Sequence, residues 1–218
     1  GSVNKLGKPV IPLDYDDVLD YHEGLATVEL DGKQGAVDRD GKLVVPLAYE
    51  EVGEFEHGLA PAAKGGRYGY IDARGNEVIP FSFDGAMRFH HGMAVVVIND
   101  QRGVIDTKGE LVVPCAYDWV EGFLSKPLSR MRKGGHMGII NRFGEVVLAA
   151  EHDHVGPFKD GLSLVIDQGK CGYVDTKGLW VIPQRYEANA LTIGMGDFHN
   201  GLARVLSGGK WGMGDTAG

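Results

Sequence analysis

Residues 69–80 read GYIDARGNEVIP, and this pattern returns along most of the chain. Each copy opens with a glycine, two mostly aliphatic or aromatic residues and an Asp or Asn, and the copies begin at Gly35, Gly69, Gly103, Gly138, Gly172 and Gly212. The first three copies are 34 residues apart. A fixed period of this length is the signature of a repeat protein, in which each copy builds one supersecondary unit. The sequence therefore predicts an array of six related units.

Each unit is expected to consist of short strands and tight turns. Residues 25–30 alternate apolar with small or polar side chains, residues 31–33 supply a hairpin turn, and a return strand begins at Gly35. Asp38 is predicted to accept backbone hydrogen bonds in the next turn. A third strand is expected to end at Pro46, which cannot donate to a ladder, and residues 49–55 are expected to form a bulged strand. The predicted fold class is all-β, with six repeats of about 34 residues.

Glycine is frequent, with 34 of 218 residues, and it recurs at fixed offsets rather than in runs. This distribution indicates turns in an ordered array. At Gly58, Gly92 and Gly161 we expect either a positive φ or a backbone approach too close for a Cβ.

Charge and composition exclude several classes of function. The net charge of −8 argues against nucleic acid and favours a basic partner. No stretch approaches the roughly 18 consecutive apolar residues of a membrane span. Cys115 and Cys171 are predicted to be small hydrophobic residues in a reducing compartment. We therefore expect a monomer that binds a protein partner, with no cofactor and no metal.

The N-terminus bears on location and domain limits. Gly1 and Ser2 are typical of a cloning scar, and residues 1–5 are interpreted as a terminal remnant. The expected location is the cytoplasm, unless an upstream signal has been removed. Residues 6–218 are predicted to form one domain, because the repeat leaves no natural boundary.

The repeated motifs resemble those of the WG-repeat family, bacterial arrays of roughly 35-residue units. The family consensus runs Lys-Trp-Gly-Tyr-Ile-Asp, Gly, Val-Ile-Pro, Tyr, then Phe-x-x-Gly-Leu-Ala, and the resemblance covers residues 6–218. The signature tryptophan is kept at Trp211, and the same slot elsewhere holds Gln34, Tyr68, Arg102, Met137 and Cys171. The resemblance implies a non-enzymatic, β-rich scaffold that binds other macromolecules.

The phase of the array favours closure. The chain begins with the second part of a unit, Val10-Ile11-Pro12, and ends after the turn at Asp215 that would precede it. Complementary halves of one unit can pair, as in a β-propeller, and this removes exposed strand edges. We therefore favour a closed, six-unit, propeller-like ring over an open β-solenoid.

Two segments depart from the period, and function is often added at such departures. An insertion at residues 187–197 carries apolar residues on an expected surface loop, and the unit between residues 122 and 152 carries a basic cluster. An exposed apolar anchor dominates interface energy, while charges add mainly to the association rate. We predict that these departures contact the partner through Leu191, Ile193, Met195, Arg130, Arg132 and Lys133.

Histidine offers the remaining candidate chemistry. Five histidines share two neighbouring repeat slots: His22, His90 and His199 in one, His57 and His91 in the next. A structural or solvated role is predicted for them. His152 and His154 lack a third ligand for a metal site, and no nucleophile motif or phosphate loop indicates catalysis.

Two alternatives to a scaffold stay open. One is an immunity or inhibitor protein whose acidic face binds a basic toxin or enzyme. The other is a hydrolase or carbohydrate-acting propeller with a site on the histidine-bearing rim, because propeller sites assemble from distant loops.

Overall fold

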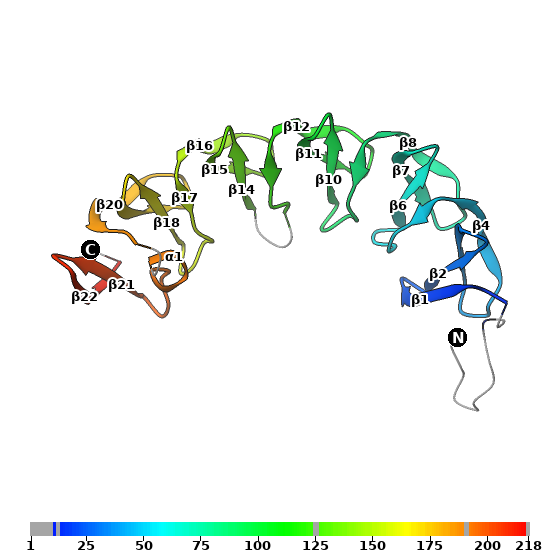
Figure 1. The fold of residues 1–218 in the computed structure, drawn as a ribbon, viewed down its shortest axis with the longest axis horizontal. Helices are drawn as coiled ribbons and strands as arrows, with labels where there is room; N and C mark the ends of the chain where they lie inside the picture. Colours follow the sequence, from blue (N-terminus) through cyan, green and yellow to red (C-terminus); the bar gives the residue numbers. More distant parts are fainter. Residues whose placement is uncertain (1–10, 12–13, 124–126, 190–191, 217–218) are drawn as a thin grey trace, which may run out of the picture. The chain divides into compact units, whose positions relative to one another are not determined.

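The computed structural model of the protein describes residues 11, 14–123, 127–189 and 192–216. The chain divides into two compact units, residues 1–115 and 116–218, which are described separately. Both consist of antiparallel strands joined by short turns (Figure 1), which confirms the all-β prediction with repeated units. The one helix among the described residues, α1 (Thr192–Met195), has four residues, and none there is long and apolar enough to cross a bilayer. The single domain over residues 6–218 stays a prediction.

The first unit contains three sheets, and each follows one repeat as a four-stranded meander. The first sheet comprises β1 (Asp17–His22), β2 (Leu25–Leu30), β3 (Lys33–Val37) and β4 (Leu43–Tyr49). The second comprises β5 (Glu51–Val52), β6 (Leu59–Lys64), β7 (Arg67–Asp72) and β8 (Glu77–Phe83). The third comprises β9 (Gly85–Ala86), β10 (Met93–Ile98), β11 (Gln101–Asp106) and β12 (Leu111–Tyr117).

The second unit contains one four-stranded and one six-stranded sheet. The four-stranded sheet comprises β13 (Trp119–Val120), β14 (Leu128–Lys133), β15 (His136–Asn141) and β16 (Val146–His152). The other comprises β17 (His154–Val155), β18 (Leu162–Asp167), β19 (Lys170–Asp175), β20 (Trp180–Glu187), β21 (Leu202–Ser207) and β22 (Lys210–Asp215). Each sheet has a linear strand order in the described residues, so no sheet closes on itself. Residues 10 and 12 of the predicted closing strand lie outside the described ranges.

The Asp that follows the third strand of a repeat organises the next turn. Asp38 Oδ1 accepts hydrogen bonds from the backbone N–H groups of Asp40 (3.0 Å) and Lys42 (2.9 Å). The same pair of bonds recurs at Asp72, Asp106, Asn141 and Asp175. The predicted turn role of these side chains is confirmed, because each accepts hydrogen bonds from backbone N–H groups of the turn that it begins.

A second recurring cap was not predicted from the sequence. Glu50 Oε1 and Oε2 accept hydrogen bonds from the backbone N–H groups of Gly65 and Gly66, each at 2.9 Å. These bonds stabilise the charged form and lower the pKa of Glu50. The same slot, directly after the repeat aromatic residue or His, is acidic in every unit, and its carboxylates cap the matching hairpin turns at Asp16, Asp84, Asp118, Asp153 and Glu187.

The strand that carries the repeat proline continues through it, which corrects the prediction that the strand ends there. Pro46 lies in the middle of β4, and β4 is the last strand of its sheet. An edge strand has one side without a ladder, so a residue with no N–H is tolerated. The strand expected within residues 49–55 is present as β5.

Two kinds of glycine explain why the repeat keeps this residue. Gly58, Gly92 and Gly161 have φ values of 74°, 78° and 80°, which confirms the predicted positive φ. Gly69 lies inside β7, where a Cβ would be 2.6 Å from the carbonyl oxygen of Ile79 in β8. The turn glycines are therefore needed because they adopt a positive φ. The strand glycine is needed because the neighbouring strand leaves no room for a Cβ.

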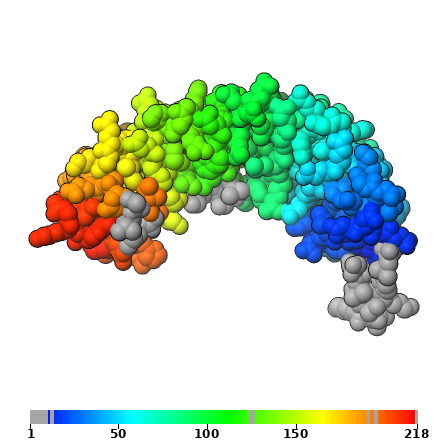
Figure 2. All heavy atoms as spheres, in the orientation of Figure 1, coloured from blue at the N-terminus to red at the C-terminus, as the bar shows by residue number. Residues whose placement is uncertain are grey.

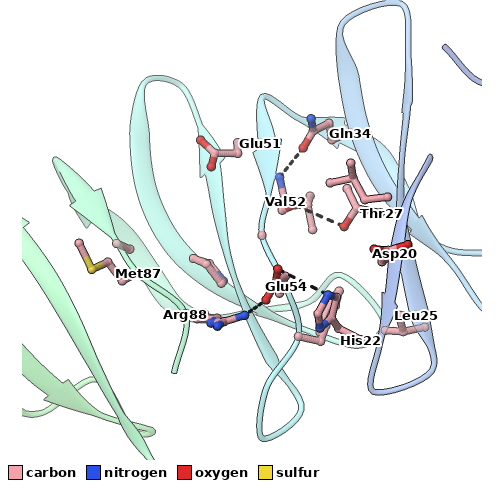
Figure 3. A pocket seen from close by; sticks show the side chains of 15 residues that line it. Asp20, His22, Leu25, Thr27, Gln34, Glu51, Val52, Glu54, Met87 and Arg88 are labelled. Atoms are coloured by element: carbon pink, nitrogen blue, oxygen red, sulfur yellow. Dashed lines mark hydrogen bonds and ion pairs between the residues drawn. The ribbon is translucent and has the colours of Figure 1, made fainter. Parts of the chain in front are cut away.

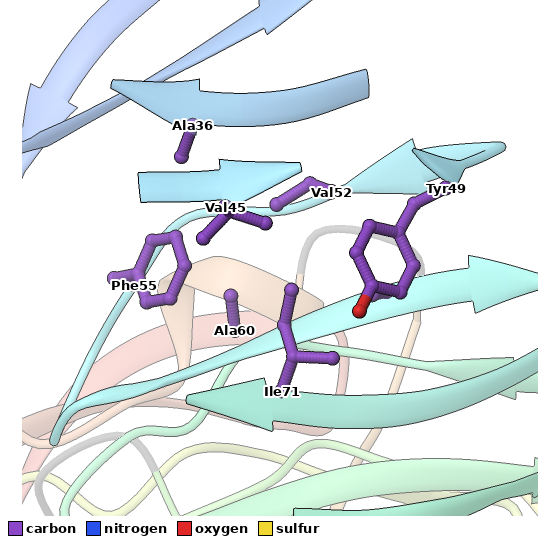
Figure 4. Close-up of a cluster of buried hydrophobic side chains, with 8 residues drawn as sticks. Ala36, Val45, Tyr49, Val52, Phe55, Ala60 and Ile71 are labelled. Atoms are coloured by element: carbon purple, nitrogen blue, oxygen red, sulfur yellow. The ribbon is translucent and has the colours of Figure 1, made fainter. Parts of the chain in front are cut away.

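Each pair of neighbouring repeats in the first unit shares a cluster of buried apolar side chains. Val45 and Tyr49 of β4 pack with Val52, Phe55 and Ile71 of the next repeat (Figure 4). Burial of these side chains supplies nearest-neighbour stabilisation, as in other repeat arrays. Consecutive repeats of this unit accordingly pack directly against each other, from blue to cyan in Figure 2.

Candidate functional site

The predicted apolar contact region lies around α1. Asn189 caps this helix, because its Oδ1 accepts a hydrogen bond from the Thr192 N–H at 3.2 Å. Thr192 is buried, whereas Ile193 is 51% exposed. Leu191 and the side chain of Met195 lie outside the described part of the protein. Ile193 is thus the described member of the three that the structure places at the surface.

The predicted basic cluster separates into an internal arginine and an exposed pair. Arg130 Nε and Nη2 donate to the two carboxylate oxygens of Glu121 at 2.9 and 2.8 Å, and Nη1 donates to the Val155 carbonyl at 3.4 Å. The hydrogen bonds to Glu121 raise the pKa of Arg130. Arg132 and Lys133 are exposed. Arg130 therefore serves contacts within the fold, while the other two remain accessible to a partner.

The two departures from the period meet near Gly156. Asp197, at the end of the insertion, lies so close that a Cβ at Gly156 would be 3.1 Å from its Oδ1. Burial raises the pKa of Asp197 and lowers the pKa of His154. The positive charge of Arg130 acts on both groups: it adds to the lowering of the His154 pKa and partly opposes the rise of the Asp197 pKa. The structure therefore joins Arg130 and the end of the insertion in one polar cluster.

The repeated histidines lie at hairpin turns, and three of them, His22, His57 and His90, lie within 4 Å of a carboxylate oxygen. His22 Nε2 is 3.5 Å from Glu54 Oε1, and His90 Nδ1 is 3.1 Å from Glu56 Oε2. In the next slot His57 has a φ of 55°, which is typical of a residue in a two-residue hairpin turn. In the described ranges, no group of three or more His, Cys, Asp or Glu is arranged to hold a metal ion.

The first unit contains a pocket of about 820 Å³, lined by residues of its three repeats (Figure 3). Its walls include Thr27 of β2, Pro61 of β6 and Met87, which follows β9. Apolar side chains such as Leu25 and Phe55 complete much of the lining. The volume lies within the range of about 300–1,000 Å³ that is common for ligand pockets.

Charged side chains meet at one side of this pocket. Glu54 forms an ion pair with Arg88, and it also faces His22 (Figure 3). Glu51 and Asp20 line the pocket as well, and both are exposed. Within the described residues, the Asp20 side chain makes no hydrogen bond or ion pair to another side chain. Three carboxylates against one arginine give the pocket a negative balance.

The pocket was not predicted from the sequence, although one signal for it was present. Asp20, Glu54 and Arg88 occupy the same repeat slot, directly before the aromatic residue that precedes the hairpin turn. This slot changes in charge from repeat to repeat, whereas the turn and cap positions stay Asp, Asn or Glu. A variable charge within a regular pattern could have identified this position.

Short β-meanders with capped turns and shared cores define the class of β-repeat proteins. The family model described as WG containing repeat matches residues 1–33, 35–68, 68–101, 103–135, 137–171 and 172–211. The chain therefore belongs to the WG containing repeat family, and the resemblance drawn from its motifs is confirmed. No curated protein matches the sequence.

Several solved structures are similar at low identity. Hsv2p from Kluyveromyces lactis is 13% identical, with a TM-score of 0.44 over 74% of this chain and 62% of its own. The WD40 beta propeller domain of Doa1 is 13% identical, with a TM-score of 0.37 over 93% and 82%. The dihydro-heme d1 dehydrogenase NirN is 13% identical, with a TM-score of 0.41 over 88% and 50%. The chain spans less than two thirds of Hsv2p, and likeness at this level carries no argument about function.

Proposed function

We propose that this protein is a non-enzymatic protein-interaction module. The support comes from how its polar side chains are divided between fold and pocket. The recurring carboxylates, such as Asp38 and Glu50, are engaged by backbone N–H groups of their own turns. The polar residues that differ between repeats, Asp20, Glu54 and Arg88, line the pocket instead. Groups that the repeat does not need for its turns are the ones available to a partner.

Site-specific photo-crosslinking in a native cell extract tests this function. A photoreactive amino acid replaces Met87 at the pocket or, as a matched control, Arg74 in an exposed turn of the same unit. We expect the Met87 position to capture a defined protein, and an excess of unlabelled protein to suppress that capture. Equal capture at both positions, or none at Met87, would contradict the proposal.

We further propose that the repeats close into a ring rather than form an open solenoid. β22 is the third strand of its repeat and, in the part of the chain that is described, pairs with β21 alone. A Cβ at Gly212 would meet no atom within 4 Å, whereas one at Gly69, in the same slot, would meet the backbone of β8. This free face of β22 suits a strand with the sequence pattern of residues 8–12.

A further inference from the structure

We propose that the pocket of the first unit binds an arginine or lysine side chain presented by an extended segment of a protein partner. The inference rests on the proposed interaction function and adds the site and the chemistry of the bound group. It is carried by an equivalent position in the second unit, where the protein places an arginine of its own.

The equivalence of the two positions follows from the repeat and from matching hydrogen bonds. Thr27 and Arg130 occupy the third position of the second strand in their repeats, β2 and β14. Thr27 Oγ1 donates to the Val52 carbonyl, and Arg130 Nη1 donates to the Val155 carbonyl, each at 3.4 Å. Both acceptors lie 25 residues after the donor, in the first strand of the next repeat. The two side chains therefore enter the same space between consecutive repeats.

A guanidinium group fills this space in the second unit. Arg130 donates a bidentate pair of hydrogen bonds to Glu121, and its Cζ lies 5.9 Å from the centroid of the Trp119 ring. Bidentate arginine–carboxylate pairs and cation–π contacts are among the stronger ways to hold a cation. The inter-repeat space of this fold is thus suited to a cationic side chain.

Shorter residues leave the same space open in the first unit. Thr27 of the first repeat and Pro61 of the second stand in the slot of Arg130. Leu19 and Gly53 of the same two repeats stand where the fourth repeat has Glu121. These residues line the pocket. The methylene groups of an incoming lysine or arginine would lie against the apolar part of the lining, such as Phe55.

The remaining carboxylates match the charge of such a side chain. Glu54 already pairs with Arg88, whereas Glu51 accepts a neutral hydrogen bond from the Tyr68 hydroxyl at 2.5 Å. Asp20 is exposed and lies in a bulged part of β1. Asp20 and Glu51 are therefore the carboxylates that face a bound cation. The net charge of −8 adds attraction for a basic segment and repulsion for an anionic one.

The probe for a binding test is a short fluorescent peptide with one arginine between serine and proline residues. Its matched control carries citrulline, which keeps the shape of arginine and lacks the charge. Binding is measured by fluorescence anisotropy and by the NMR signal of the Met87 methyl group. We expect saturable binding of the arginine peptide with a shift of the Met87 signal, and at least about tenfold weaker binding of the citrulline peptide.

Variants locate the binding within the pocket. Asp20→Asn and Glu51→Gln should each weaken the arginine peptide by about five- to tenfold. Glu77→Gln, which removes an exposed carboxylate outside the pocket, should leave the affinity unchanged. Thr27→Arg introduces a side chain at the slot of Arg130 and should abolish binding. If Thr27→Arg fails to fold, the two carboxylate variants still decide the question.

Several outcomes would overturn the inference. The first is equal binding of the two peptides, and the second is unchanged affinity in both Asp20→Asn and Glu51→Gln. The third is tight binding of spermidine at the pocket without binding of the arginine peptide, which would make the pocket a polyamine site. If crosslinking at Met87 persists in Asp20→Asn, the recognition of a cationic side chain is wrong, while the interaction function stands. Loss of crosslinking with intact peptide binding would remove the function and retain the site.

Discussion

The strand glycine of the repeat offers a sharp test of why this fold holds together. Replacing Gly69 by Ala adds a Cβ that would lie 2.6 Å from the Ile79 carbonyl oxygen and 2.9 Å from the Pro80 carbonyl carbon. Both atoms belong to the backbone of β8, so a side-chain rotation cannot relieve the contact. Carbon–oxygen contacts normally begin at about 3.3 Å, so β8 must move away by roughly 0.7 Å.

This displacement sets the expected size of the effect. Overpacking of a well-packed site costs typically about 1–3 kcal/mol, and we expect the upper end for Gly69→Ala, because backbone rather than a side chain must yield. In a chain of this size, 1 kcal/mol shifts the melting temperature by about 2–4 °C. The melting temperature should therefore fall by roughly 6–12 °C.

Gly212→Ala is the matched control, because Gly212 shares the repeat slot of Gly69 and has no atom within 4 Å of an added Cβ. In an open array we expect no loss there, and a gain of up to about 1 kcal/mol, because alanine loses less conformational entropy than glycine in a strand. In the closed ring proposed above, a strand of residues 8–12 would lie against β22 as β8 lies against β7, so Gly212→Ala should cost about as much as Gly69→Ala. Urea unfolding followed by circular dichroism measures both changes, and hydrogen exchange of residues 67–83 locates the first. If Gly69→Ala matches the wild type, the crowding argument is wrong, whereas a gain in Gly212→Ala would contradict the closed ring.

Four further predictions concern turns, caps, the insertion and closure. Replacing Gly92, with its φ of 78°, by Val should lower the free energy of unfolding in urea by more than about 1 kcal/mol. An unfolding midpoint equal to that of the wild type would show that this position does not require glycine. The backbone hydrogen bonds from Gly66 and Gly65 hold the pKa of Glu50 below its ordinary value, so its cap stabilises the fold above the ordinary pKa of a Glu side chain and is lost as the pH falls through the folded pKa. Thermal melts from pH 7 to pH 3 should show this loss in the wild type and a smaller one in Glu50→Gln; parallel curves would argue against the cap. Deleting residues 189–194 should leave the fold intact and abolish partner capture, and undiminished capture would exclude the insertion as the contact. Deleting residues 210–218 should weaken hydrogen-exchange protection throughout a closed ring, whereas fraying confined to the last repeat would indicate an open array.

Features that depend on a few neighbouring residues could be predicted from the sequence. The Asp38 turn, the positive φ of Gly92 and the strand over residues 25–30 each follow from local hydrogen bonds, local sterics or alternation. Because six repeats carry the same local patterns, the period of the sequence was enough to predict the fold class. The acidic residue at the position of Glu50 also recurs in every repeat. Its role as a cap was nevertheless not predicted, because its backbone partners lie across a hairpin.

Other features depend on which strands become neighbours, and only the tertiary structure decided them. β4 could continue through Pro46 because it is the last strand of its sheet, a property of strand order rather than of the strand's own residues. Arg130 is held within the fold because the chain brings Glu121 and Val155 to it from both sides. Thr27, which stands in the strand position of Arg130, lines the pocket together with residues of the next two repeats, and these residues come together only when consecutive repeats pack against each other. Local chemistry determined the repeat, while the contacts between repeats, which no single period contains, determined where the pocket of the first unit lies.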